Sequence, residues 1–514
     1  MKKKTFLKFL PIAGVFVAAF IGTFAENANA IPPFARKYKT SCQTCHVAFP
    51  KLNPFGMAFR ANGYRMPGGD EMFIKDEPIP LGAPAYKRLW PKSIWPSDIP
   101  YLPPIGFTMF TNLWIGEDKE MTTEFDGLEE FAILLGGTLG ESFSFFFDWH
   151  LWNWGQNKGW LDRAQIVYTP QWIEPLGIVN VQVGQFEPRA TPMLGGHRNL
   201  ITLKGTPTAV AWPVYPIGNL WGFFPNQKGI EFFGGLNGPK GKGGFEWAAG
   251  IVNGEQAITQ MFGGQNDGRT PNRELGRFDD NDFKDFYGRL SYKIGGMGVQ
   301  GGGEVEESLV AAENWQDGET LFGDVKSSAK FGIFYYRGKS DFRSTGQLGT
   351  SPEDNTDYFE RYGVDVDWII SNFNIIGSAV VFDDNLNKDV SYPGRRASLL
   401  PDGTLDPRTF DSDDDFKTYI YTAEIDWVAY PWLMPAVRYE WIQPDYSFTA
   451  NSSFAKASEN PVTTKDFERL SFDVVTLLRA NVKLVTGAHF SIGEPPPSGS
   501  HWRDQFRIGL DIAF

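Results

Sequence analysis

The sequence predicts a mainly β protein in which a small α-helical N-terminal unit is fused to a 16-stranded antiparallel transmembrane β-barrel. Apolar and polar residues alternate from Ile105 onward, in many segments close to the length of a membrane-spanning strand. The links between these segments alternate between short and long, as in bacterial barrels. No segment beyond residue 30 has the ~20 consecutive apolar residues of a membrane helix, so a membrane-embedded part must be a closed barrel.

Residues 1–30 have the pattern of a secretory signal peptide. Four lysines precede a largely apolar run at 9–25, and Ala28-Asn29-Ala30 is a small-residue cleavage site. We expect its removal, which takes away four lysines and Glu26 and changes the net charge from −13 to about −16. An exported acidic protein with 15% aromatic residues suits a barrel with aromatic girdles, and predicts no nucleic-acid partner.

The segment Ser41-Cys42-Gln43-Thr44-Cys45-His46 holds both cysteines of the chain. C-x-x-C-H is the attachment signal for a c-type haem, in which both thiols bind the porphyrin and the histidine is the proximal iron ligand. A redox disulfide and half of a zinc site are the alternatives. A zinc site needs about four ligands, and no second Cys or His pair has a useful spacing. A redox C-x-x-C would sit in a βαβ context, which is missing. The motif therefore predicts one covalent haem c.

Residues 31–77 form the predicted haem unit. A unit of fewer than 50 residues is too small to fold on an apolar core alone, and the haem would supply the missing apolar mass. Leu52, Phe55 and Phe59 recur at helical spacing, and Asn62-Gly63 can end a helix. We expect a short helix whose apolar face lies on the porphyrin.

The distal iron ligand is predicted to be a methionine of the same unit. Met57, Met66 and Met72 are the candidates, since no second histidine lies in the unit. A thioether ligand would raise the reduction potential relative to a second imidazole. Met66 follows the helix and has more freedom to reach the iron than Met57, which lies within it. Each methionine could instead pack against the ring, and a five-coordinate iron or a distant histidine are further alternatives.

Residues 78–104 carry eight prolines and predict an extended linker, which leaves 105–514 for the barrel. Charged residues on the second face of the strands, such as Asp365 and Glu424, suit a wet lumen, although they would also suit the exposed face of a soluble sheet. The sixteen predicted strands are 106–117, 129–138, 142–153, 161–169, 177–186, 228–236, 243–253, 284–293, 328–337, 359–369, 373–382, 417–427, 432–443, 466–476, 479–490 and 504–514.

Two connections and three histidines stand out in the barrel part. The loop 187–227 carries Arg189, His197, Arg198 and Lys204, and could either fold inward as a constriction or lie outside. Residues 294–327 form a long link where a short turn is expected. The barrel histidines at 150, 489 and 501 are interpreted as structural or lumenal, and we identify no catalytic residue.

The chain resembles the fused monohaem cytochrome c–porins, the outer-membrane iron oxidases of iron-oxidising bacteria. The resemblance rests on the C-x-x-C-H motif, on the run from Phe49 to Gly56, and on Asn62-Gly63-Tyr64. The barrel part is also similar to phosphate-selective porins at 137–140 and 183–186. The resemblance implies that Cys42, Cys45 and His46 bind a haem that takes electrons from extracellular Fe²⁺ and passes them to a periplasmic cytochrome. It carries over no iron-binding residue.

These observations predict an electron conduit in the bacterial outer membrane. A 16-stranded barrel has room for a plug, so residues 31–77 could lie inside it or on its periplasmic side. The expected partners are an extracellular electron donor such as Fe²⁺, a periplasmic c-type cytochrome and outer-membrane lipid. One alternative is a diffusive anion porin with an appended periplasmic cytochrome, and another is outward electron transfer to extracellular acceptors. The sequence predicts neither the direction of electron flow nor the oligomeric state.

Overall fold

The structure, a computed structural model, describes most of the predicted barrel and the part of the N-terminal unit that contains the motif. The signal peptide, the linker 78–104, Met72, His197, Arg198, Lys204 and His501 lie outside the described residues. No helix in the described part is long and apolar enough to cross a membrane. The described residues are 33–38, 40–66, 105–116, 123–139, 142–153, 160–190, 210, 223, 226–254, 283–301, 327–341, 356–385, 415–445, 466–493 and 504–513.

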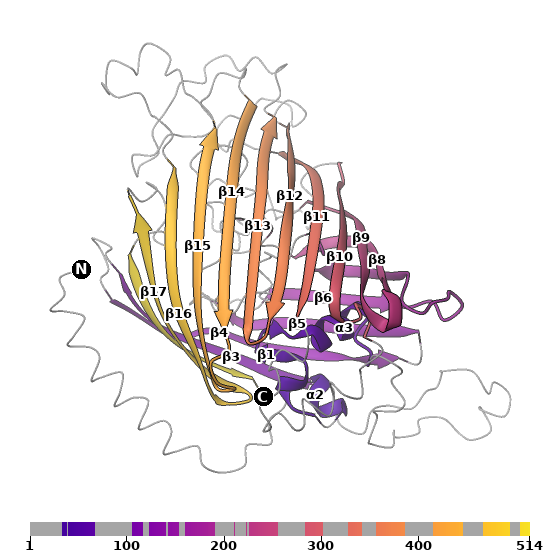
Figure 1. Ribbon diagram of the computed structural model, residues 1–514, viewed down its shortest axis with the longest axis horizontal. Coiled ribbons are helices and arrows are strands. Elements are labelled where there is room, and N and C mark those ends of the chain that lie inside the picture. Colours follow the sequence, from indigo (N-terminus) through magenta and orange to yellow (C-terminus); the bar gives the residue numbers. More distant parts are fainter. Residues whose placement is uncertain are drawn as a thin grey trace.

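Sixteen strands form one closed antiparallel barrel, as the sequence predicts (Figure 1). Each strand from β3 to β18 pairs with its neighbours in the chain, and β18 closes the ring on β3. Closure pairs the backbone groups of every strand on both sides, as a lipid environment requires. The strands are β3 (Ile105–Gly116), β4 (Thr123–Leu139), β5 (Phe143–Asn153), β6 (Trp160–Tyr168), β7 (Asn180–Phe186), β8 (Gln227–Asn237), β9 (Lys242–Val252), β10 (Asp285–Met297), β11 (Ser328–Asp341), β12 (Thr356–Ile370), β13 (Phe373–Asn385), β14 (Asp415–Trp427), β15 (Leu433–Asp445), β16 (Phe467–Arg479), β17 (Val482–Ile492) and β18 (Gln505–Ala513).

The outer surface of the barrel is apolar. Large hydrophobic side chains such as Ile333, Val364 and Phe472 are exposed at alternate positions along the strands. Aromatic residues gather near the short turns, where Phe373 stacks on Trp427 with ring centroids 5.9 Å apart. This is the surface of a barrel whose outside faces lipid and whose rim lies in a membrane interface.

The N-terminal unit, residues 33–66, consists of short elements: α2 (Pro33–Tyr38), the 3₁₀ turn η1 (Cys42–Thr44), the paired strands β1 (His46–Ala48) and β2 (Lys51–Leu52), and α3 (Pro54–Ala61). The predicted short helix is present as α3. Leu52, however, lies in β2, because Asn53 caps the helix and Pro54 begins it, so that the helix starts after Leu52.

This unit lies inside the barrel, at the end where the short turns are (Figure 1). On one side, Val47 and Ala48 pack against β12 and β15–β17 in a cluster that includes Val475. On the other side, the unit contributes to a second cluster, which we call the unit–barrel cluster. Its members are Tyr38, Phe55, Ala58, Phe59, Tyr64 and Met66 of the unit and Leu134, Phe146, Val167, Phe233, Ala248 and Met297 of the barrel, with Phe34 and Cys45 packed against them. The unit therefore bridges two walls of the lumen.

A buried polar contact fixes the unit to the wall. The Lys51 ammonium is 1% exposed, pairs with the Asp426 carboxylate of β14 and donates to Asn374 Oδ1 of β13 at 2.5 Å. From the wall, Lys483 of β17 donates to the carbonyl of Phe49 at 2.5 Å. Contacts to β13, β14 and β17 thus hold the segment that follows the motif.

The described part of the β7–β8 connection also folds inward. Ala190, Val210 and Phe223 are almost fully buried, and the Phe223 ring lies 5.7 Å from the Phe334 ring and 5.8 Å from the Tyr336 ring. For these residues the inward interpretation holds and the external one is wrong. The contacts join the connection to inner-face side chains of β11.

We expect Lys51→Met to destabilise the unit within the barrel, because it leaves the Asp426 carboxylate buried without its cation. Removing one member of a buried pair costs about 3–5 kcal/mol. Hydrogen exchange should show faster amide exchange across residues 40–66 and little change in the barrel strands. Lys240→Met, at the exposed turn η2 (Pro239–Gly241), is the matched control. Unchanged exchange in the Lys51 variant would contradict the role of this contact.

Candidate functional site

The two cysteines of the motif are held one turn apart. η1 starts at Cys42, and the Cys45 N–H donates to the Cys42 carbonyl at 3.2 Å. The two cysteines form no disulfide with each other; Cys42 is buried, and Cys45 is half-buried and packs against the unit–barrel cluster. Both reactive sulfurs of the predicted attachment site thus lie within the barrel.

The His46 imidazole is oriented by a backbone carbonyl. Its Nδ1 lies 3.1 Å from the Pro50 oxygen. A carbonyl can only accept, so Nδ1 carries the proton and Nε2 carries the lone pair of the neutral ring. This is how metal-binding histidines are commonly held, with one ring nitrogen donating to a carbonyl and the other available as a ligand.

Asn53 joins the motif to the helix that follows it. Its side-chain oxygen accepts from the Gly56 N–H at 2.8 Å, and its side-chain nitrogen donates to the Thr44 carbonyl at 3.0 Å. Gly56 is required there, since a Cβ on it would lie 2.1 Å from the Cys45 carbonyl oxygen. Sequence reasoning missed both roles, although Asn followed by Pro is a recognisable helix start.

Burial makes both thiols poor thiolates. It raises the pKa of Cys42 from 9.0 to about 11 and that of Cys45 to about 12. A redox-active C-x-x-C usually has a lowered thiol pKa. Among the described residues, the one group that could hold a metal ion includes neither cysteine. Two adjacent thiols, a neighbouring imidazole and an apolar cluster are the groups that would hold a covalent haem c.

The two methionines near the motif have different surroundings. Met66 is 4% exposed and belongs to the unit–barrel cluster, against which Cys45 packs. Met57 is half-buried on α3 and is not a member of that cluster. The structure therefore places Met66, rather than Met57, in the apolar environment shared with the motif.

Aromatic side chains connect the unit to the barrel wall. The Phe34 ring stacks on Tyr64 with centroids 5.5 Å apart, and Tyr64 stacks on Phe146 of β5 at 5.7 Å. Gln165 of β6 donates to the Tyr64 hydroxyl at 2.8 Å. Tyr64, singled out by the sequence only as part of a motif, is thus an aromatic contact with the wall, together with Phe34, whose ring stacks on Phe146 at 6.2 Å.

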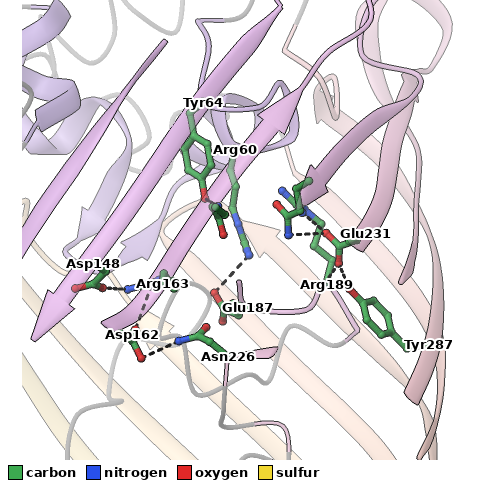
Figure 2. Close-up of polar contacts among 12 residues, drawn as sticks. Arg60, Tyr64, Asp148, Asp162, Arg163, Glu187, Arg189, Asn226, Glu231 and Tyr287 are labelled. Atoms are coloured by element: carbon green, nitrogen blue, oxygen red, sulfur yellow. Dashed lines mark hydrogen bonds and ion pairs between the residues drawn. The ribbon is translucent and has the colours of Figure 1, made fainter. Parts of the chain in front are cut away.

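Charged side chains line the lumen beside the unit (Figure 2). Arg60 of α3 lies 3.4 Å from Glu187, the residue after β7. Further along the wall, Arg189 pairs with Glu231 of β8, which also accepts from the Tyr287 hydroxyl. Arg189, predicted as a possible constriction residue, is therefore part of a buried network rather than an open ring of charge.

No family model matches the chain, and no curated protein matches it. Solved outer-membrane porins share the barrel architecture. A loop-deletion mutant of OmpT from Vibrio cholerae is 9% identical with a TM-score of 0.42, and 80% of this chain covers 98% of that one. OmpF of Salmonella typhi, in complex with daunomycin, is 9% identical with a TM-score of 0.43, and the match covers 80% of this chain and 97% of that one. OprD of Pseudomonas aeruginosa is 11% identical with a TM-score of 0.33, and the match covers 80% of this chain and 94% of that one. At these scores the likeness carries no argument about what this chain binds or transports.

In protein prepared without a covalent cofactor, we expect both cysteines to be alkylated slowly. Only the thiolate reacts, so the raised pKa should slow Cys42 at pH 8 by about 10- to 100-fold relative to the unfolded chain. The rate should rise with pH until about pH 11 for Cys42 and pH 12 for Cys45. Mass spectrometry of iodoacetamide-treated protein measures this, with urea-unfolded chain as control. Equal rates in folded and unfolded protein would contradict the buried placement.

Proposed function

We propose that the protein is an outer-membrane electron conduit that carries one haem c on Cys42, Cys45 and His46. Electrons would pass from an extracellular donor, with Fe²⁺ as the candidate, to a periplasmic c-type cytochrome, so that the protein acts as an iron(II) oxidase. One observation carries the proposal: the C-x-x-C-H motif belongs to a unit that packs against the inner wall of the barrel on two sides.

The residues around the motif have distinct tasks in this proposal. The cysteines attach the cofactor, the Pro50 carbonyl orients His46, and Asn53 fixes the motif relative to α3. The unit–barrel cluster excludes water. A bound haem c supplies reversible one-electron chemistry, while the protein sets the reduction potential of the haem and the access of electron donors and acceptors to it.

The position within the barrel suits transfer across a membrane. The hydrocarbon layer is about 30 Å thick, so a redox centre hanging below it could not serve a donor outside. Short turns face the periplasm in bacterial barrels, and the unit lies at that end. A centre inside the lumen shortens the distance to the outer mouth while it stays close to a periplasmic acceptor.

A diffusive porin with an appended cytochrome is the second candidate. The barrel itself favours it, because a closed barrel of sixteen strands is wide enough for an aqueous channel. The described interior favours the conduit, because residues 33–66 and part of the β7–β8 connection occupy space that a solute would need. Outward electron transfer would use the same haem to pass electrons from the periplasm to an extracellular acceptor. The reduction potential of the haem decides between inward and outward transfer.

Purified protein should show a c-type absorption spectrum with one haem per chain, be reduced by Fe²⁺, and conduct weakly in planar lipid bilayers. The double variant Cys42→Ser/Cys45→Ser should keep the barrel and lose the spectrum. A well-formed spectrum that Fe²⁺ does not reduce would remove iron as the donor. Large open-channel currents with the unit in place would favour the porin.

Met66→Leu and Met57→Leu form a matched pair that tests the distal ligand. If the Met66 sulfur is the ligand, Met66→Leu should convert the haem from low spin to high spin and lower its potential, since thioether ligation raises the potential. Met57→Leu should change neither. Absorption spectroscopy with redox titration measures both variants. A spin change in Met57→Leu alone would reverse the assignment.

A further inference from the structure

Asp148, His150 and Asp162 meet on the inner wall of the barrel, outside the N-terminal unit. One donor atom from each lies within 4.8 Å of the other two. His150 Nε2 is 3.4 Å from Asp148 Oδ1 and 3.9 Å from Asp162 Oδ2. Donor atoms that share one metal ion at about 2.1 Å lie about 3–3.5 Å apart, so small side-chain movements would complete a coordination shell.

Two β-bulges shape this group. Between β5 and β6 the register passes from Asp148–Arg163 to Trp149–Leu161, so Asp162 is an extra residue. Between β4 and β5 it passes from Ala132–His150 to Phe131–Trp152, which makes Leu151 an extra residue. Bulges re-aim side chains and are frequent beside functional sites. Here they flank the His150 position on both sides.

The surroundings of the imidazole are those of a metal ligand. Glu130 Oε2 lies 3.5 Å from His150 Nδ1, on the side of the ring opposite the two aspartates. Histidines that bind metals commonly have a carboxylate beside their second ring nitrogen, and Glu130 has this place here at an ion-pair distance rather than in a hydrogen bond. Nε2 then faces both aspartates.

The net charge of the side chains around His150 favours a bound divalent cation. The two aspartates share one cation, Arg163, which pairs with both of them (Figure 2). A metal ion on Nε2 would take the place of a proton there, so His150 would bind it as a neutral imidazole between the two carboxylates. Asp148 is 3% exposed, and its Oδ1, the oxygen nearest Nε2, accepts no hydrogen bond from any described residue. A buried carboxylate oxygen in that position needs a partner.

The group lies next to the aromatic contact with the unit. The Arg163 guanidinium is 5.3 Å from the centre of the Phe146 ring, which stacks on Tyr64. Asp162 is close to the start of β6 at its long-loop end, and Asn226 donates to its Oδ1 at 2.8 Å. The aspartates and His150 therefore lie between the long-loop side of β5–β6 and the N-terminal unit.

We propose that Asp148, His150 and Asp162 form a divalent transition-metal site in the lumen, and that Fe²⁺ binds there as the electron donor. The second half of this statement rests on the proposed function. One imidazole and two carboxylates suit Fe²⁺ and Mn²⁺. The conversion of Fe²⁺ to Fe³⁺ releases one electron and no proton, and a ferric haem c is the one-electron oxidant that the proposed function names.

Mn²⁺ titration followed by electron paramagnetic resonance tests the site without redox chemistry. The purified protein should bind one Mn²⁺ per chain, and His150→Gln/Asp162→Asn should weaken binding at least about tenfold. Asp148 is left unchanged because it accepts a hydrogen bond from Arg163, whereas Asp162 lies 3.3 Å from Arg163 Nε and accepts from Asn226. The matched control is His489→Gln/Asp473→Asn, a second buried inner-wall pair, in which His489 Nε2 lies 3.6 Å from Asp473 Oδ1. Heat-modifiable migration in gels verifies that each barrel folds.

Haem reduction then separates this site from the proposed function. The Fe²⁺ concentration for half-maximal reduction rate should rise at least tenfold in His150→Gln/Asp162→Asn, while dithionite reduces every variant equally. Equal Mn²⁺ affinity in wild type and this variant, or no Mn²⁺ binding at all, overturns the site. Mn²⁺ binding that depends on these residues in a protein that Fe²⁺ cannot reduce supports the site and rejects the iron-oxidising function.

Discussion

The structure depends on one constraint: a unit of fewer than 50 residues cannot bury enough apolar surface to fold alone. The barrel wall supplies the missing surface. Phe55 and Phe59 pack with Leu134 and Phe146, while Val47 packs on the far wall. The unit and the inner wall therefore share two hydrophobic clusters, and the position of the motif inside the barrel follows from the same contacts that order the unit.

The lumen is packed in two different ways. Where the β7–β8 connection folds inward, the wall is aromatic and aliphatic, with Phe223 against Tyr336. On β14–β16, Arg438 lies 3.7 Å from Glu424 and 3.5 Å from Glu440, and all three are fully buried. Charges withdrawn from water need partners, so these residues are paired rather than presented to a solute.

Much of the barrel could be read from the sequence because its signal is local. Apolar and polar residues alternate along the last strand, from Phe506 to Ile512. This pattern predicts which side chains face lipid, since successive residues of a strand point to opposite faces. All sixteen strands appear close to their predicted positions. The helix α3 was equally readable from its spacing, but its start was not, because the Asn53 cap that excludes Leu52 acts through hydrogen bonds to a neighbouring turn.

The sequence by itself determined the barrel class, the number of strands and the C-x-x-C-H motif, because alternation and spacing are properties of adjacent residues. Tertiary structure decided where the motif lies, which methionine shares its surroundings, and that His150 meets two aspartates. The first two features depend on packing between the unit and the barrel wall, and the third depends on the register and bulge of the β5–β6 pair. Lys51 and Asp426 form a buried pair although they are 375 positions apart in the chain. Neither segment has a local pattern from which this pairing could be predicted.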